Sequence, residues 1–217
     1  MTLPGKVGHE ARAGWILAAI AALEGAWVAL NFSINPRGFA TFLGFVPGAM
    51  GAASGWILAL LVALAYVAAS CRLPSVRANL FRPSGLKAIA LALAVASGIL
   101  EEAVFRKLLM DALGRRLLGE AVQVIASGLA FGLAHGMWGL FGKSVRAAIG
   151  ATVATGILGA ALALAYIASG RNVAPCIFAH FLINALVEPG LVLAAQRGEM
   201  GALRSASGSS PIDRQSP

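Results

Sequence analysis

The chain has 217 residues, of which 59% are hydrophobic and only 12% are charged, and its net charge is +8. A soluble domain carries about twice that charged fraction, so the composition favours a membrane protein whose first partner is the lipid bilayer. The basic residues lie between apolar runs or near the chain ends rather than among aromatic residues, which argues against nucleic acid as a partner. Two cysteines, Cys71 and Cys176, are too few for a disulfide framework or a thiolate zinc cluster.

Six apolar segments follow one another along the chain. They cover residues 13–32, 56–70, 86–110, 121–140, 145–168 and 173–195, and the second could begin as early as Phe45. A helix of about 20 apolar residues crosses a bilayer. Small residues are frequent in the last four segments, and such residues let helices approach closely in lipid. The sequence therefore predicts an all-α fold, a polytopic transmembrane helical bundle with about six spanning helices.

The basic residues of the connections predict an orientation. If every segment spans, the side with both termini, the 72–87 connection and the Lys143/Arg146 connection carries 11 Lys and Arg residues. The opposite side carries 5, with the intramembrane Arg106 left out of the count. The positive-inside rule then places both termini in the cytoplasm. Glu101 and Glu102 lie in the C-terminal half of segment 86–110, so this topology expects them nearer the non-cytoplasmic surface.

Segment 86–110 contains three ionisable residues, Glu101, Glu102 and Arg106. Each such group costs at least about 2.5 to 3.5 kcal/mol on insertion scales and usually marks a functional site. Glu102 and Arg106 are four residues apart, so they can pair across one helical turn. Glu101 is rotated by about 100° from Glu102 and stays free to hold water or accept a proton. The alternative is a Glu–Arg pair that only fixes helix packing.

Two later segments carry further polar residues at helical spacing. His135 follows Phe131 by four residues, and Asn184 follows His180 by four, so each pair shares a helix face. A single histidine on an apolar face is more often a packing residue than a ligand. Asn184 needs hydrogen-bond partners at membrane depth and is therefore expected to face the bundle. Glu188 extends the His180/Asn184 stripe, but Pro189 follows it, and no role is assigned to Glu188.

These residue types fit the hydrolysis of an amide bond. A carboxylate and an imidazole can hold and deprotonate water, while an imidazole and a carboxamide can donate to the developing oxyanion. No serine or cysteine has an evident histidine partner, and the zincin motif H-E-x-x-H is absent. Glu101, His135 and His180 could together ligate Zn²⁺ and leave one position for water. Both a zinc site and a metal-free site stay open.

Together these residues resemble the three motifs of the CPBP intramembrane proteases, the family of the CaaX prenyl-protein endopeptidases and of bacterial relatives tied to bacteriocin self-immunity. The motifs are Glu101-Glu102-x-x-x-Arg106, Phe131-x-x-x-His135 and His180-x-x-x-Asn184. Each motif alone is weak. Their order on three separate apolar segments is specific, and the resemblance extends over roughly residues 86–193.

The resemblance implies an intramembrane endopeptidase, of metallo- or glutamic type, that acts on a membrane-proximal or C-terminal segment of a peptide or protein. By analogy, Glu101 activates the attacking water, His135 helps to position it, and His180 and Asn184 stabilise the oxyanion. Glu102 and Arg106 are then supporting residues. The resemblance implies no choice between Zn²⁺ and a metal-free mechanism, nor between prenylated and unprenylated substrates.

The apolar segments, the composition of the tail and the resemblance together suggest a division of the chain. Residues 1–85 form N-terminal transmembrane helices and loops, residues 86–196 a catalytic helical core, and residues 197–217 a disordered, Ser/Gly/Pro-rich tail. The alanine- and glycine-rich composition favours a bacterial inner membrane. A non-enzymatic membrane protein, such as a proton-coupled carrier or an immunity or scaffold protein, could use the same buried Glu/His set. The symmetry-related broken helices of many transporters are not evident.

Overall fold

The computed structural model describes residues 4–137 and 145–202, and every regular element within these ranges is a helix. The elements are α1 (Pro4–Ile34), α2 (Pro36–Phe42), α3 (Ala53–Ser70), α4 (Pro74–Asn79), α5 (Gly85–Glu102), the π-helix η1 (Ala103–Met110), α6 (Asp111–Arg115), α7 (Glu120–His135), α9 (Val145–Ala168), α10 (Ala174–Val187), α11 (Gly190–Gln196) and α12 (Glu199–Ala202). The prediction of an all-α polytopic bundle is confirmed.

The predicted number of six spans is approximate. Four helical stretches of the described chain are long and apolar enough to cross a membrane, namely Gly8–Ile34, Ala53–Ser70, Gly85–Arg115 and Val145–Ala168. Helices α10 and α11 give a fifth if they count as one span, although they meet at an angle of 55°. Helix α7 has 16 residues, and the end of its predicted segment, residues 138–140, lies outside the described residues.

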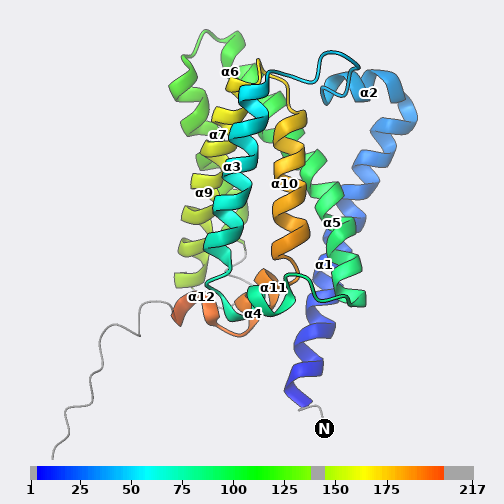
Figure 1. The fold of residues 1–217 in the computed structure, drawn as a ribbon, viewed down its shortest axis with the longest axis vertical. Coiled ribbons are helices and arrows are strands. Elements are labelled where there is room, and N and C mark those ends of the chain that lie inside the picture. Colours follow the sequence, from blue (N-terminus) through cyan, green and yellow to red (C-terminus); the bar gives the residue numbers. More distant parts are fainter. Residues whose placement is uncertain (1–3, 138–144, 203–217) are drawn as a thin grey trace, which may run out of the picture.

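Different short helices lie at the two ends of the bundle (Figure 1). The short helices α4, α11 and α12 lie at the end where the chain begins, and α2 and α6 lie at the opposite end (Figure 1). Helix α10 ends at Val187 because Pro189 disfavours helical backbone at the residue before it, and Glu188 is extended with ψ of 146°. Pro189 thus lies at the bend between α10 and α11.

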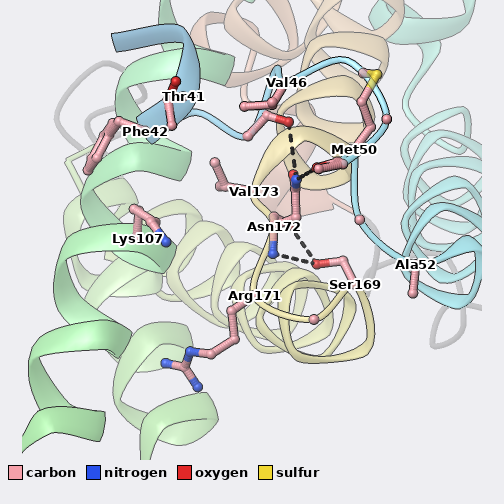
Figure 2. Close-up of a pocket in the computed structure, with 15 residues that line it drawn as sticks. Thr41, Phe42, Val46, Met50, Ala52, Lys107, Ser169, Arg171, Asn172 and Val173 are labelled. Atoms are coloured by element: carbon pink, nitrogen blue, oxygen red, sulfur yellow. Dashed lines mark hydrogen bonds between the residues drawn. The ribbon is translucent and has the colours of Figure 1, made fainter. Parts of the chain in front are cut away.

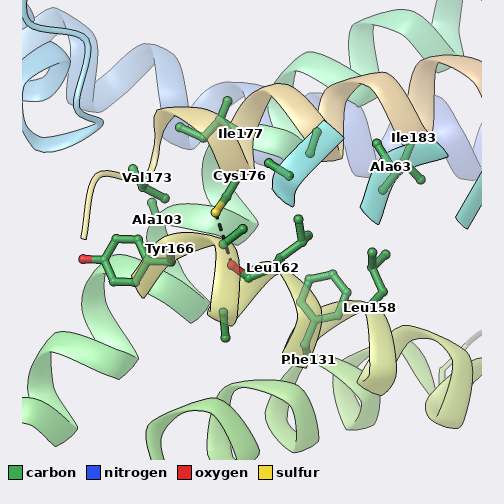
Figure 3. Packing of buried hydrophobic residues seen from close by; sticks show 14 of the residues in the cluster. Ala63, Ala103, Phe131, Leu158, Leu162, Tyr166, Val173, Cys176, Ile177 and Ile183 are labelled. Atoms are coloured by element: carbon green, nitrogen blue, oxygen red, sulfur yellow. Dashed lines mark hydrogen bonds between the residues drawn. The ribbon is translucent and has the colours of Figure 1, made fainter. Parts of the chain in front are cut away.

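A buried apolar cluster joins α3, α7, α9 and α10. Its members include Ala63, Phe131, Leu162, Tyr166 and Ile183, all at most 1% exposed, and Figure 3 shows how they interdigitate. A second cluster packs Leu17 of α1 against helices α5 and α11. The N-terminal helix therefore shares a core with the later helices, while the division at residues 85 and 196 stays a prediction. Of the predicted tail, residues 203–217 lie outside the described residues.

Two glycines allow the close helix contacts that position the polar residues. A Cβ atom on Gly132 of α7 would lie 2.5 Å from the carbonyl oxygen of Thr152 in α9. A Cβ atom on Gly98 of α5 would lie 3.3 Å from the carbonyl oxygen of Ile177 in α10. Small residues at such crossings let two helix backbones approach. The crossings bring the parts of α5, α7 and α10 that carry polar side chains to one place.

Candidate active site

The polar residues of the three motifs meet in one connected cluster. Arg106 Nε lies 3.0 Å from Glu102 Oε2, and Glu102 Oε1 lies 2.8 Å from His180 Nδ1. Glu101 Oε2 lies 3.9 Å from His180 Nε2 and 3.5 Å from His135 Nε2. Three helical stretches that are far apart in the sequence therefore contribute to a single group of charged and titratable side chains.

One half of the cluster is closed off from the surface. The side chains of Glu102 and Arg106 are 0% exposed, and that of His180 is 3% exposed. Arg106 also donates from Nη2 to the carbonyl oxygen of Gly159 at 3.2 Å, and its guanidinium lies 4.7 Å from the ring centre of Phe131. The two partners of the Glu102 carboxylate, Arg106 and His180, offset the cost of burying its charge.

The other half of the cluster is reachable. The side chains of Glu101 and His135 are 17% and 20% exposed. His135 Nδ1 lies 2.9 Å from the carbonyl oxygen of Phe131, which can only accept, so Nδ1 carries the hydrogen and Nε2 is left as an acceptor. The Phe131 ring stacks on the imidazole at 4.4 Å. The hydrogen bond and the stacked ring hold Nε2 towards Glu101.

Residue Asn184 lies beside this cluster. Its Nδ2 donates to Ser97 Oγ of α5 at 2.9 Å, and both residues line a cavity of about 330 Å³. Glu101, His135 and His180 line the same cavity, whereas Glu102 and Arg106 do not. The four residues expected to meet the substrate thus face one space, and the two expected to support them lie behind it.

The cavity extends towards the end of the bundle where the chain begins. Its wall continues from Glu101 to Ser70, Leu73 and Glu188, which lie near the short helices α4 and α11 (Figure 1). Glu101 itself lies near the middle of the span Gly85–Arg115. The expectation that the site lies nearer the non-cytoplasmic surface rests on the charge distribution alone and stays a prediction.

Sequence reasoning missed a third carboxylate near the cluster. Glu24 of α1 interacts electrostatically with Glu101 and His180, and its Oε2 is buried with no hydrogen-bond partner in the described chain. Glu24 is the only acidic residue in the apolar segment 13–32. The insertion cost that drew attention to Glu101 applies equally to Glu24 and would have found it.

The proposed zinc ligands do not form a recognisable metal site. Within residues 4–137 and 145–202, no group of three or more His, Cys, Asp and Glu side chains has the arrangement that holds a metal ion. His180 directs Nδ1 to Glu102 and His135 directs Nδ1 to a main-chain carbonyl, so each offers one nitrogen to Glu101.

A second cavity, of about 530 Å³, lies at the opposite end of the bundle. Figure 2 shows Lys107, Arg171 and Asn172 around it, and none of the predicted site residues lines it. Asn172 Nδ2 donates to the carbonyl oxygens of Gly44 and Ala49 at 3.1 and 2.8 Å. These bonds fix the connection between α2 and α3, and Lys107 and Arg171 are paired with Asp111.

Comparison with known proteins identifies one family. Residues 83–186 match the family model described as type II CAAX prenyl endopeptidase Rce1-like. The match includes all three motifs and confirms the resemblance to CPBP proteins. It supports, in general terms, a CAAX-protease-like intramembrane endopeptidase and a multi-pass membrane protein. No curated protein matches the chain, and no solved structure does.

Proposed function

Because residues 83–186 belong to the CPBP family, we propose that the chain hydrolyses a peptide bond of a membrane-proximal or C-terminal substrate segment with water activated by Glu101 and His135. The observation that carries the proposal is the pair of acceptor atoms, Glu101 Oε2 and His135 Nε2, which lie 3.5 Å apart. The Ala- and Gly-rich composition favours a bacterial inner membrane as the location.

Water activation follows from the chemistry of these two atoms. The carboxylate oxygen and the unprotonated imidazole nitrogen both accept hydrogen bonds and cannot satisfy each other. One water molecule can donate a hydrogen to each of them, which directs an oxygen lone pair into the cavity. Glu101 then takes a proton as the water oxygen attacks the substrate carbonyl carbon, and the proton later passes to the leaving amine.

The oxyanion is assigned to His180 and Asn184. With Nδ1 donating to Glu102, a protonated His180 can donate from Nε2 into the cavity, and Glu102 compensates its positive charge. The carboxamide of Asn184 supplies a second N–H donor from the next turn of α10. Donors held in place before the reaction stabilise the transition state more than the substrate.

Glu102 and Arg106 are assigned a supporting role. Both side chains are fully buried and neither reaches the cavity, so they cannot touch substrate in this arrangement. Arg106 neutralises Glu102, and Glu102 orients the His180 ring. The π-helix η1 begins directly after Glu102 and carries Arg106. π-Helical segments are rare, and those that occur are frequently at functional sites.

The proposal is tested by comparing membranes that contain wild-type protein with membranes that contain Glu101→Ala. New protein termini mapped by mass spectrometry should appear with the wild type and be absent with the variant. Asp111→Asn is the control variant for loss of a carboxylate outside the proposed site, because Asp111 lies in a separate ion-pair group with Lys107 and Arg171. Equal terminus profiles with wild type and Glu101→Ala would overturn the proposed reaction. Proton flux in liposomes that depends on Glu101, without any cleavage, would indicate a carrier instead.

Zinc is tested separately. Metal content of the purified full chain, measured beside cleavage before and after chelation, distinguishes the two types of enzyme. The mechanism above expects cleavage to persist after chelation, since Glu101 and His135 activate the water. Loss of cleavage on chelation, restored by Zn²⁺ alone, would contradict it.

A further inference from the structure

The cavity has a second polar region, centred on Glu188. Glu188 follows the last residue of α10 and is 5% exposed, yet it lines the cavity. Tyr66 of α3 lines the cavity as well and interacts electrostatically with Glu188. The mechanism proposed above uses neither residue. A buried glutamate in the wall of a substrate cavity therefore needs its own explanation.

The carboxylate of Glu188 has little compensation from the protein. It forms no ion pair among the described residues, and its one hydrogen bond, from the main-chain N–H of Val192, is 3.3 Å long. Lys87 interacts electrostatically with Glu188, but its Nζ donates to the main-chain oxygens of Leu186 and Glu188 at 3.0 and 2.7 Å and forms no direct ion pair with the Glu188 carboxylate. Of the described residues that line the cavity, none is Lys or Arg. A buried carboxylate without a direct ion pair is unfavourable and attracts a cation.

The spacing along α10 sets the distance of this carboxylate from the reacting groups. Glu188 lies eight residues beyond His180 on the same helix stripe, which corresponds to about 12 Å along the helix axis. An extended peptide advances about 3.3 Å per residue. A substrate that occupies both regions of the cavity therefore presents to Glu188 a side chain about three or four residues from the scissile bond.

We propose that Glu188 binds a Lys or Arg side chain of the substrate at that position. The inference rests on the proposed function and narrows its substrate class to basic, membrane-proximal segments. The cavity extends towards the end of the bundle that the charge distribution assigns to the cytoplasm. Segments of membrane proteins that flank a helix on that side are rich in Lys and Arg. A free C-terminal carboxylate at the same place would be repelled by Glu188.

The test uses the full chain in liposomes and a peptide copied from the strongest Glu101-dependent cleavage site. Versions of the peptide carry Lys, Gln or Glu three or four residues from the scissile bond, on either side of it. The wild type should cleave the best Lys peptide at least about tenfold more efficiently than its Gln counterpart, because a desolvated charge pair is lost. The Glu peptide should be cleaved least.

Two variants assign this preference to Glu188. Glu188→Gln should reduce the Lys-over-Gln preference to about twofold or less, and Glu188→Lys should favour the Glu peptide. Glu120→Gln is the matched control, since Glu120 is exposed and does not line the cavity, and it should keep the wild-type preference. The peptide series on the wild type needs no variant to fold.

The outcomes separate the two proposals. Cleavage by the wild type without a charge preference, or a preference that survives in Glu188→Gln, overturns the role of Glu188 and leaves the peptidase intact. Absence of any Glu101-dependent cleavage site overturns the peptidase, and the role of Glu188 with it.

Discussion

The two neighbouring glutamates of α5, Glu101 and Glu102, differ in how the cost of placing a carboxylate in a membrane is offset. Glu102 is 0% exposed and is compensated by Arg106 and His180, whereas Glu101 is 17% exposed and lies beside the acceptor nitrogen of His135. Both carry the same insertion cost in a membrane. The cost is offset by fixed partners in one case and by access to the cavity in the other, and only the second arrangement leaves an oxygen atom free for chemistry.

Glu101→Gln should have the largest effect on cleavage. The change keeps the shape of the side chain but removes the base, so cleavage should fall by about 10² to 10⁴-fold, the contribution typical of a positioned general base. Insertion and thermal unfolding should be nearly unchanged, because Glu101 has no fixed ion pair with Lys or Arg. Turnover of the mapped substrate peptide in liposomes checks the first statement. Cleavage at the wild-type rate would remove Glu101 from the mechanism.

Arg106→Met tests the buried half of the cluster. Glu102 would keep its charge in a fully buried place without its cation, which should destabilise the protein by about 3 to 5 kcal/mol. Unfolding in denaturing detergent measures this loss. The double variant Glu102→Gln/Arg106→Met should recover much of the stability, since no unpaired charge remains. A single variant as stable as the wild type would show that the ion pair does not fix the cluster.

Asn184→Ala tests whether Asn184 donates to the oxyanion in the cavity. Loss of an oxyanion donor should reduce kcat by about 10² to 10³-fold. Ser97→Ala removes only the hydroxyl acceptor of the Asn184 carboxamide, so it should have a smaller effect on kcat than Asn184→Ala. Equal losses in the two variants would indicate that Asn184 acts only through its packing position.

Gly132→Ala should have the smallest effect of the four. The added methyl group meets the Thr152 carbonyl, so α7 and α9 must move apart, at a cost of about 1 to 3 kcal/mol. The same movement shifts His135 relative to Glu101 and should lower cleavage. Gly150→Ala is the matched control on α9, because nothing lies within 4 Å of its added Cβ atom. Matching stability in the two variants would contradict the close approach.

Features that depend only on local order along the chain could be predicted from the sequence alone. Apolar runs of spanning length predicted the helical bundle, because the bilayer sets the length of a helix. The four-residue spacing predicted the Glu102–Arg106 ion pair. The ion pair forms although Arg106 lies in the π-helix η1. The three motifs also predicted which residues gather, since each lies on a separate apolar segment.

Contacts that depend on how the helices cross became visible only in the tertiary structure. The bond between Glu102 and His180 joins residues 78 positions apart, and nothing local to either residue selects the other. The nearness of Glu24 to Glu101 and the direction of the cavity towards Glu188 have the same origin. Helical periodicity fixes the face on which a side chain stands, but only the packing of small residues between helices fixes what that face meets.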